Sequence, residues 1–360
     1  MRILCVVPYP PDRAPGQRYR LEQWLQLLPP GSLEFELHPL LDEATYARLY
    51  EPGRWAAKIG GALSGLVRRL HDVVDAKAWD AAYLYREAFP LGLPVLEGLL
   101  QRRVPVVYDF DDAIFLGDTS PANRVIGRFK RPDKVATVIG RSAVTTVGNA
   151  WLASYARQFA SDVRVIPTTV DTDRYVPVPG TDKGTVRVGW SGSPTTSPHL
   201  RIVAGALEKI SREPGVDLYF VGDPDLRLPG VPVQVRRWDS GREIADLASM
   251  DIGIMPLPDD PWSRGKCGLK ALLYMAMGLP TIVSPVGVAT EIVEDGVNGL
   301  VATTEDEWLD ALQALVADAD LRRRLGEAAR RTVLERYSGA QWAPHFLRAL
   351  SDAVGSGRGA

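Results

Sequence analysis

Residues 266–299 read KCGLKALLYMAMGLPTIVSPVGVATEIVEDGVNG, and this stretch decides the fold. Its pattern predicts a loop, a helix from Lys270, a buried strand at 281–283 and a second loop at 284–287. A helix N-terminus offers free backbone N–H groups and the positive end of the helix dipole, so it suits an anion. Lys266 and Lys270 lie one turn apart at this end, which makes a phosphate group the expected ligand.

The alternative is a pair of solvated surface lysines, and the neighbouring residues favour the ligand. Gly265 and Gly268 let the backbone approach a bound molecule closely. The predicted strand also ends in Ser-Pro-Val-Gly, at the edge where ligands bind in open α/β sheets.

Together these residues resemble the donor-binding helix of GT-B glycosyltransferases, in particular the large retaining family 4. The resemblance implies an α/β chain with two doubly wound, Rossmann-like domains facing a cleft. It implies transfer of a sugar, hexosyltransferase-like, from a nucleotide-diphosphate donor to a hydroxyl acceptor, with retention, front-face attack, no metal and no cofactor. Lys266 and Lys270 would then stabilise the charge that develops on the leaving diphosphate.

The length, net charge and cysteine content of the chain limit which classes of protein it can belong to. The 360 residues suit two domains, and a net charge of −2 gives no case for nucleic-acid binding. Cys5 and Cys267 imply no disulfide framework and fit a reducing cytoplasm. No apolar run approaches the roughly 18 residues of a membrane span. The histidines are scattered without metal-ligand spacing: His38, His71, His199 and His345.

Apolar strand-like runs alternate with helical periods, which is typical of a parallel α/β sheet. The predicted strands are Ile3–Pro8, Glu34–His38, Ala82–Tyr85, Val104–Tyr108, Ala143–Val147, Val163–Ile166, Val186–Ser191, Asp217–Val221, Val233–Arg236, Ile252–Met255, Thr281–Val283 and Gly299–Val301. The predicted domains are an acceptor-side domain at 1–166, a linker at 167–184, a donor domain at 185–338, a helix returning to the first domain at 339–354 and a disordered tail at 355–360.

A dehydrogenase is the first alternative for a doubly wound chain. The segment after the first strand, residues 8–16, lacks a G-x-G-x-x-G fingerprint, and the turn at 189–194 does not supply one. A P-loop is also missing, so phosphoryl transfer with Mg²⁺ has no support.

The stretch VGWSGSPTTSPHL at 188–200 resembles the first loop of the family's donor domain, which touches the diphosphate. A plain tight turn is the alternative interpretation. Many relatives place an Arg and a Lys after this strand, where this chain has Ser-Pro-Thr-Thr, so Lys266 and Lys270 are expected to carry that charge. The expected donor-binding residues are Gly192, Ser193, Gly222, Trp238, Gly268, Leu269 and Glu291.

One departure from the family pattern is large. Most relatives carry an E-x7-E motif whose carboxylates contact the sugar and the ribose, and the matching positions here are Gly265 and Leu273. Glu291 is the candidate for the ribose contact, and Asp259 or Asp260 is the candidate for the sugar contact.

The acceptor side is expected at two strand ends of the first half, where functional loops gather. Arg86 and Glu87 follow one strand, and Asp111 and Asp112 follow another. One of these aspartates is expected to orient the acceptor hydroxyl, so both are catalytic candidates together with Lys266 and Lys270. The alternative is a helix N-cap followed by acids that the helix dipole favours. By resemblance, Gly16 and Arg20 form the glycine-loop edge of the cleft, with Arg20 contacting an anion.

Residues 54–70 are amphipathic and basic, and further positive charges follow at Arg124, Arg128, Lys130, Arg131, Lys134 and Arg141. Such segments rest on anionic lipid in some proteins, while an ordinary solvated face is the alternative. The first interpretation predicts a protein peripheral to the inner membrane face, with a lipid-linked or envelope-bound acceptor and a role in envelope glycan or glycolipid synthesis.

Two other functions remain open at this point. The missing carboxylates favour a catalytically degenerate GT-B domain acting as a binding or scaffold subunit. A nucleotide-sugar epimerase shares the fold but needs catalytic carboxylates or histidines in the cleft.

Overall fold

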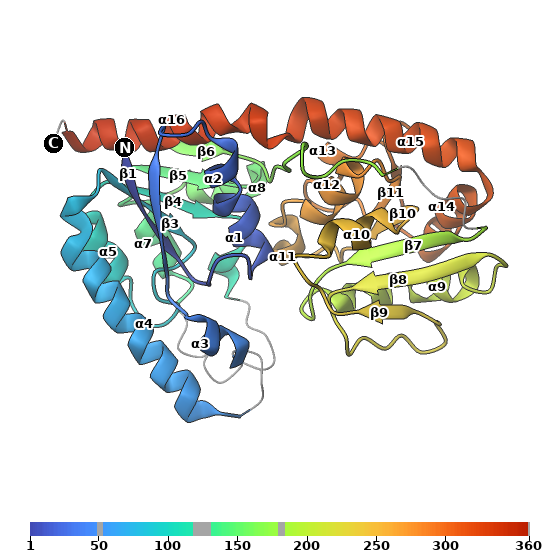
Figure 1. Cartoon of the computed structure of the whole chain (residues 1–360), viewed down its shortest axis with the longest axis horizontal. Coiled ribbons are helices and arrows are strands. Elements are labelled where there is room, and N and C mark those ends of the chain that lie inside the picture. Colours follow the sequence, from blue (N-terminus) through green and yellow to red (C-terminus); the bar gives the residue numbers. More distant parts are fainter. Residues whose placement is uncertain (49–52, 118–130, 179–183, 359–360) are drawn as a thin grey trace. The chain divides into compact units, whose positions relative to one another are not determined.

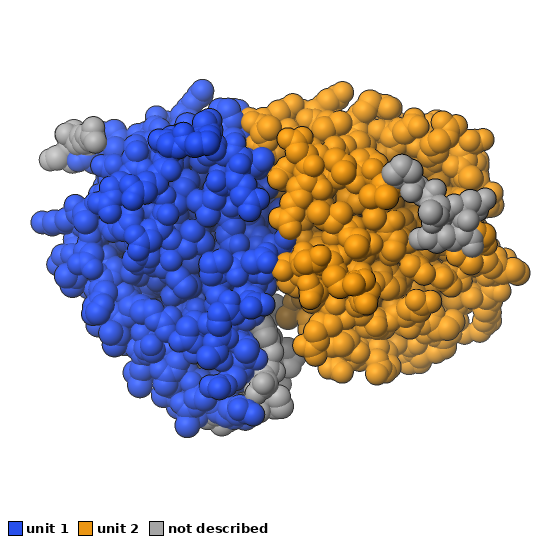
Figure 2. All heavy atoms as spheres, in the orientation of Figure 1, with its two compact units in different colours: residues 1–168, 342–360 blue, residues 169–341 orange. Residues whose placement is uncertain are grey.

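The computed structural model describes residues 1–48, 53–117, 131–178 and 184–358 (Figure 1). The chain divides into two compact units, coloured separately in Figure 2. Unit 1 comprises Met1–Thr168 and Trp342–Ala360, and unit 2 comprises Thr169–Gln341. Each contains a six-stranded parallel sheet flanked by helices, which confirms the predicted fold class of two doubly wound units.

The sheet of unit 1 has the strand order β2-β1-β3-β4-β5-β6. Its strands are β1 (Arg2–Val7), β2 (Glu34–Pro39), β3 (Ala81–Tyr85), β4 (Val106–Phe110), β5 (Val144–Val147) and β6 (Val163–Val165). The inner strands β3 and β4 are buried along their whole length, because helices cover both faces of a parallel sheet. Their carboxyl ends bring the segments after Tyr85 and Phe110 to one edge.

The α-helices of unit 1 are α1 (Pro15–Gln17), α2 (Trp24–Leu27), α3 (Glu43–Arg48), α4 (Trp55–Asp75), α5 (Val95–Gln101), α7 (Lys134–Ile139), α8 (Ala150–Ala156) and α16 (Gly339–Arg358). Helix α16 contributes Phe346 to the core, where its ring stacks on Trp24 with centroids 5.0 Å apart. The prediction of a disordered tail from residue 355 is wrong as far as Arg358, because α16 continues to that residue.

The sheet of unit 2 has the strand order β12-β11-β10-β7-β8-β9. Its strands are β7 (Val186–Ser191), β8 (Val216–Val221), β9 (Gln234–Arg236), β10 (Ile252–Met255), β11 (Thr281–Val283) and β12 (Leu300–Val301). Its helices are the 3-10 helix η5 (Ser197–Val203), α9 (Ala204–Ile210), α10 (Glu243–Ala248), α11 (Pro261–Arg264), α12 (Leu269–Ala276), α13 (Ala289–Ile292), α14 (Glu305–Ala317) and α15 (Ala319–Thr332). The fully buried Trp190 and Trp308 belong to its core.

Helix α4 buries two of the cations that were predicted to form a basic outer face, while Arg68 stays partly exposed and pairs with Asp42. Lys58 and Arg69 are 9% and 1% exposed, and Arg69 donates to the carbonyls of Val7, His38 and Ala88 and to Asp72. The outward side of α4 is an apolar row, here called the outer stripe: Ile59, Leu63, Val67, Leu70 and Val74. Of the other predicted basic residues, Arg124, Arg128 and Lys130 lie outside the described residues, and Lys134 is buried.

Candidate functional site

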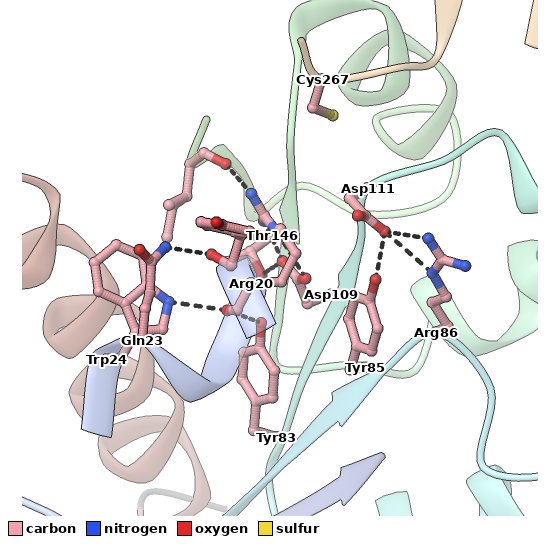
Figure 3. Close-up of polar contacts among 12 residues, drawn as sticks. Arg20, Gln23, Trp24, Tyr83, Tyr85, Arg86, Asp109, Asp111, Thr146 and Cys267 are labelled. Atoms are coloured by element: carbon pink, nitrogen blue, oxygen red, sulfur yellow. Dashed lines mark hydrogen bonds and ion pairs between the residues drawn. The ribbon is translucent and has the colours of Figure 1, made fainter. Parts of the chain in front are cut away.

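A buried ion pair anchors the edge of the unit 1 sheet (Figure 3). The Arg20 guanidinium donates to the carboxylate of Asp109 and to the Ile166 carbonyl, and the Thr146 hydroxyl donates to the same carboxylate at 2.6 Å. The side chains of Arg20 and Asp109 are 2% and 0% exposed. Arg20 was expected to contact an anion at the glycine-loop edge of the cleft. It is instead buried against Asp109 and fixes β4 against the following strands.

A second charged group lies at the carboxyl ends of β3 and β4. The Arg86 guanidinium donates to Asp111 at 2.8 Å, and the Tyr85 hydroxyl donates to Asp111 at 2.7 Å (Figure 3). Arg86 also pairs with Asp112. Arg86 has φ +60°, a left-handed backbone conformation that is uncommon for non-glycine residues and is enriched at functional sites. The structure therefore brings the predicted residues Arg86, Asp111 and Asp112 together. The two aspartates bind Arg86, whereas one of them was expected to orient the acceptor hydroxyl.

The Asp111 carboxyl is kept ionised. Burial alone would raise its pKa, but the positive charges of Arg86 and Arg20 and the hydrogen bonds from Arg86 and Tyr85 lower the pKa overall. A carboxylate held in this way is a poor proton acceptor, so the structure favours Asp111 as an anchor for Arg86 over a general base.

Gly16 belongs to this same group of residues. A Cβ atom there would lie 2.3 Å from the Tyr85 hydroxyl and 2.8 Å from an Asp111 carboxylate oxygen, so only glycine fits. Glu87 differs: Lys134 lies 3.0 Å from Glu87 and 3.5 Å from the buried Glu97, which places Glu87 in a separate ion pair.

In unit 2, positive charge gathers around the N-terminus of α12. Gly268 precedes the helix with φ +71°, and a Cβ there would lie 2.3 Å from Ile292, so the position requires glycine. The ammonium of Lys270 lies 4.8 Å from the ring centroid of Trp190, and that of Lys266 lies 5.9 Å from the ring of Trp262. Each ammonium therefore lies over an indole face, a favourable cation–π position.

Burial and the neighbouring charge of Lys266 lower the pKa of Lys270 to about 7. Burial and the charges of Lys270 and Lys266 likewise lower the pKa of His199 to about 4, against a smaller opposing effect of Asp260. Like charges held together in this way favour an anionic ligand, because an anion relieves their repulsion. Sequence analysis missed His199; a single histidine after a strand carries no signal until η5 places it near α12.

The loop after β7 contacts the loop after β8. The N–H of Gly192 donates to the Val221 carbonyl at 2.9 Å, and a Cβ on Gly222 would lie 1.7 Å from the Gly192 oxygen. Gly222 has φ +129°, so both the conformation and the space demand glycine. The Ser193 hydroxyl bonds to Thr195 at 2.8 Å, within its own turn. Gly192, Gly222 and Ser193 are thus brought to one edge of the sheet.

Three further donor candidates lie on separate elements. Trp238 follows β9, two strands from β7, and its indole donates to Glu243 at 3.1 Å. Leu269 is the first residue of α12. Glu291 has an exposed side chain on α13, the short helix that Gly268 packs against through Ile292.

Among the described residues, no carboxylate stands at the two positions where most relatives carry the glutamates of the E-x7-E motif. Gly265 and Leu273 are buried, and Leu273 is 5% exposed. Asp259 pairs with Arg264 at 2.8 Å, while the Asp260 side chain caps α11 by accepting from the N–H of Ser263 at 2.7 Å. Both candidates for the sugar contact therefore have local structural partners.

Within the described ranges, no group of three or more His, Cys, Asp or Glu residues is placed to hold a metal ion. Over the same ranges, no helix has the length and apolar character needed to cross a bilayer.

Residues 186–318 match the model of a family described as glycosyl transferases group 1. A D-inositol 3-phosphate glycosyltransferase of Nocardia farcinica is 27% identical over 289 residues, covering 66% of this chain and 62% of the relative. The same-named protein of Stackebrandtia nassauensis is 38% identical over 118 residues, covering 32% of this chain and 25% of its own. The chain thus spans less than two thirds of the length of these curated relatives.

Solved structures share the fold over nearly the whole chain. Sucrose-phosphate synthase from Thermosynechococcus elongatus superposes with a TM-score of 0.73 at 16% identity, covering 99% of both chains. HepE of Anabaena, solved with UDP and glucose, superposes with a TM-score of 0.68 at 16% identity, covering 98% of this chain and 99% of its own. This likeness establishes the GT-B fold.

Proposed function

Since residues 186–318 match the family described as glycosyl transferases group 1, we propose that this chain moves a sugar from a nucleotide-diphosphate donor to a hydroxyl acceptor. The observation that carries the proposal is the positive cluster at α12: Lys266 and Lys270 lie beside a glycine-capped helix N-terminus. HepE, which shares the fold, has been solved with UDP and with UDP-glucose, and this supports a nucleotide sugar as donor.

The proposed chemistry uses electrostatic stabilisation. When the sugar–phosphate bond breaks, negative charge develops on the leaving diphosphate, and the two ammonium groups and the N–H groups of α12 stabilise it. In this scheme the acceptor hydroxyl attacks the same face, with retention, and neither a protein nucleophile nor a metal takes part. The full charge of Lys270 then appears only with the anion, because burial beside Lys266 holds its pKa near 7 without one.

We assign the acceptor to the Arg86 group of unit 1. The guanidinium contacts Asp111 through Nε and Nη2 and Asp112 through Nη2, and these contacts fix the direction in which its other N–H groups point. Gly16 lets the backbone pack closely against the Tyr85 hydroxyl and the Asp111 carboxylate that hold Arg86. Such a site suits a neutral polyol, whose hydroxyl accepts from Arg86 and donates to Asp112.

Consumption of nucleotide sugars tests the proposal directly. The protein is incubated with UDP-, GDP-, ADP- and TDP-sugars and a panel of polyol and glycolipid acceptors, and products are followed by mass spectrometry. Acceptor-dependent release of a nucleoside diphosphate supports transfer. Binding of a donor without consumption favours the scaffold alternative, and conversion to an isomeric nucleotide sugar favours an epimerase.

We further propose that unit 1 rests on an anionic lipid surface through the outer stripe of α4, on the cytoplasmic face of the membrane. The stripe runs along a 21-residue helix, with side chains between 44% and 62% exposed. Exposed Arg54 precedes the helix and exposed Lys77 follows it. This arrangement suits an apolar face in the acyl region and cations at lipid headgroups.

Vesicle flotation tests this surface. We expect the wild type to float with phosphatidylglycerol-containing vesicles and Leu63→Glu/Val67→Glu to remain in solution. Val297→Glu, which changes an exposed apolar residue of unit 2, is the matched control and should float. Equal flotation of the double variant contradicts the proposal. A wild-type dimer that the double variant loses would assign the stripe to a second copy instead.

A further inference from the structure

The chain segment after β3 is held by buried charged side chains from three helices. The N–H groups of Ala88 and Phe89 donate to the carboxylate of Glu97 at 3.1 and 3.4 Å. The Ala88 carbonyl accepts from Arg69 at 2.8 Å, and the Phe89 carbonyl accepts from the ammonium of Lys134. Arg69 belongs to α4, Glu97 to α5 and Lys134 to α7, and these three residues are here called the backbone clamp. Charged side chains therefore satisfy every backbone donor and acceptor of two consecutive residues.

The backbone clamp is not explained by its effect on stability alone. Arg69 and Glu97 are each 1% exposed, and Lys134 is 2% exposed. Taking ions out of water costs desolvation free energy, and well-packed apolar side chains of similar volume are often at least as stabilising. Three ions gathered on one short segment therefore point to a need for a fixed backbone there.

The residue next to the clamped segment is Arg86, whose backbone is strained. Its φ of +60° lies in the left-handed region, and such strain persists only where the surrounding structure over-determines it. The N–H of Arg86 donates to the Asp109 carbonyl at 2.7 Å, so β4 fixes the chain on one side of the residue. On the other side, Lys134 contacts the Glu87 carboxylate at 3.0 Å, and the backbone clamp fixes the next two residues. Held in this conformation, Arg86 directs its guanidinium to Asp111 (Figure 3).

We infer that Lys134 and Glu97 are positioning residues of the acceptor site: through the backbone that follows Arg86, they hold its guanidinium towards Asp111 and the acceptor. The inference rests on the proposed function, which assigns the acceptor to the Arg86 group, and it deepens that assignment. Neither positioning residue needs to touch the acceptor. When the backbone clamp loses these two charges, Arg86 is expected to relax to a negative φ, and its guanidinium then separates from Asp111.

NMR of the free protein tests the backbone clamp without any substrate. The double variant Lys134→Met/Glu97→Gln removes both charges together, so neither ion stays buried without the other, and the amide oxygen at position 97 still accepts from the backbone. The Arg86 Nε–H donates to Asp111 at 3.1 Å, and its signal is identified by its absence in Arg86→Ala. We expect this Nε–H to exchange with solvent about tenfold faster in the double variant than in the wild type.

Two further variants make the NMR result decisive. The matched control Lys209→Met/Glu305→Gln neutralises an exposed pair of unit 2, so its Arg86 signal should match the wild type. Glu97→Gln alone is the milder change if the double variant does not fold, and it should show the same loss of protection in smaller degree. An Arg86 Nε–H that stays fully protected in the folded variant overturns the inference.

Acceptor kinetics test whether the backbone clamp acts through Arg86. We expect the double variant to raise the acceptor KM about tenfold and to leave the KM for the nucleotide sugar unchanged. Lys134→Arg, which keeps a positive charge and hydrogen-bond donors, should stay closer to the wild type. In an Arg86→Ala background, the double substitution should add no further rise, because the side chain through which it acts is already gone.

The outcomes separate this inference from the proposed function. An unchanged acceptor KM in the double variant, or an equal further rise in the Arg86→Ala background, overturns the role of the backbone clamp. If the wild type uses no acceptor, the proposed function fails, and the NMR measurement alone then decides whether the clamp positions Arg86.

Discussion

The two units differ in how the positive side chains at their sheet edges are balanced. In unit 1, the arginines at the sheet edge are neutralised by carboxylates from neighbouring segments: Arg20 by Asp109, and Arg86 by Asp111 and Asp112. In unit 2, Lys270 lies over an indole ring beside a second lysine, and its pKa falls to about 7. The paired arginines and aspartates of unit 1 form a rigid, electrically balanced surface that suits a neutral ligand. The two neighbouring lysines of unit 2 repel each other, so their site favours an anion.

The largest expected effect is on the stability of unit 1. Asp109→Ala leaves the Arg20 guanidinium buried without its carboxylate, and removing one partner of such a pair costs about 3–5 kcal/mol. Urea unfolding of the variant and the wild type measures this loss. The control Asp320→Ala breaks an exposed pair with Arg323 and should leave the unfolding midpoint unchanged. A small loss in Asp109→Ala would mean that unit 1 does not depend on internal neutralisation.

The next effect is on turnover. Lys270→Ala removes an ammonium from the proposed leaving-group site, and we expect sugar transfer to fall about 100-fold, the scale of losing one transition-state donor. The control is Lys209→Ala, an exposed lysine of α9 in the same unit. Steady-state release of nucleoside diphosphate measures both. Wild-type turnover in Lys270→Ala would contradict the assignment of the cluster.

The smallest effect is a change in pH dependence. Lys270 is charged below its pKa of about 7, and a bound diphosphate favours the charged form. The association constant should therefore be highest near pH 7 and fall towards pH 9, by at most about tenfold per pH unit for one proton. The variant Lys270→Arg keeps its charge throughout, so its association constant should stay flat. Calorimetric titrations of both proteins between pH 7 and 9 measure these association constants. If the two constants change with pH in the same way, the titrating group is not Lys270.

Much of the fold was predictable from the sequence. The twelve expected strands are present, with ends shifted by at most two residues, because buried parallel strands form short apolar runs between helices. Helix α12 and the two lysines at its start were also predicted, since a local pattern places them. Helix α3 was missed, since its 6 residues are too few to show a clear helical period.

The pairing of charges was not predictable. Arg20 and Asp109 are 89 residues apart, and Arg86 and Asp111 are 25 apart, so only the sheet brings them together. The amphipathic pattern of α4 was visible, but not which face lies inward; Arg69 is buried because Asp72 and three backbone carbonyls satisfy it. Local sequence patterns therefore predict the helices and strands that carry the site. Which charged side chains pair with one another depends on contacts between residues far apart in the sequence.

Calorimetry with the four nucleoside diphosphates on three proteins tests the central claim most directly: the wild type, Lys266→Ala/Lys270→Ala and Arg86→Ala. The account predicts that the wild type binds one base preferentially, that the double lysine variant loses this binding, and that Arg86→Ala keeps it, because the diphosphate belongs to unit 2. Undiminished binding by the double variant, or loss of binding in Arg86→Ala with an intact fold, would contradict it.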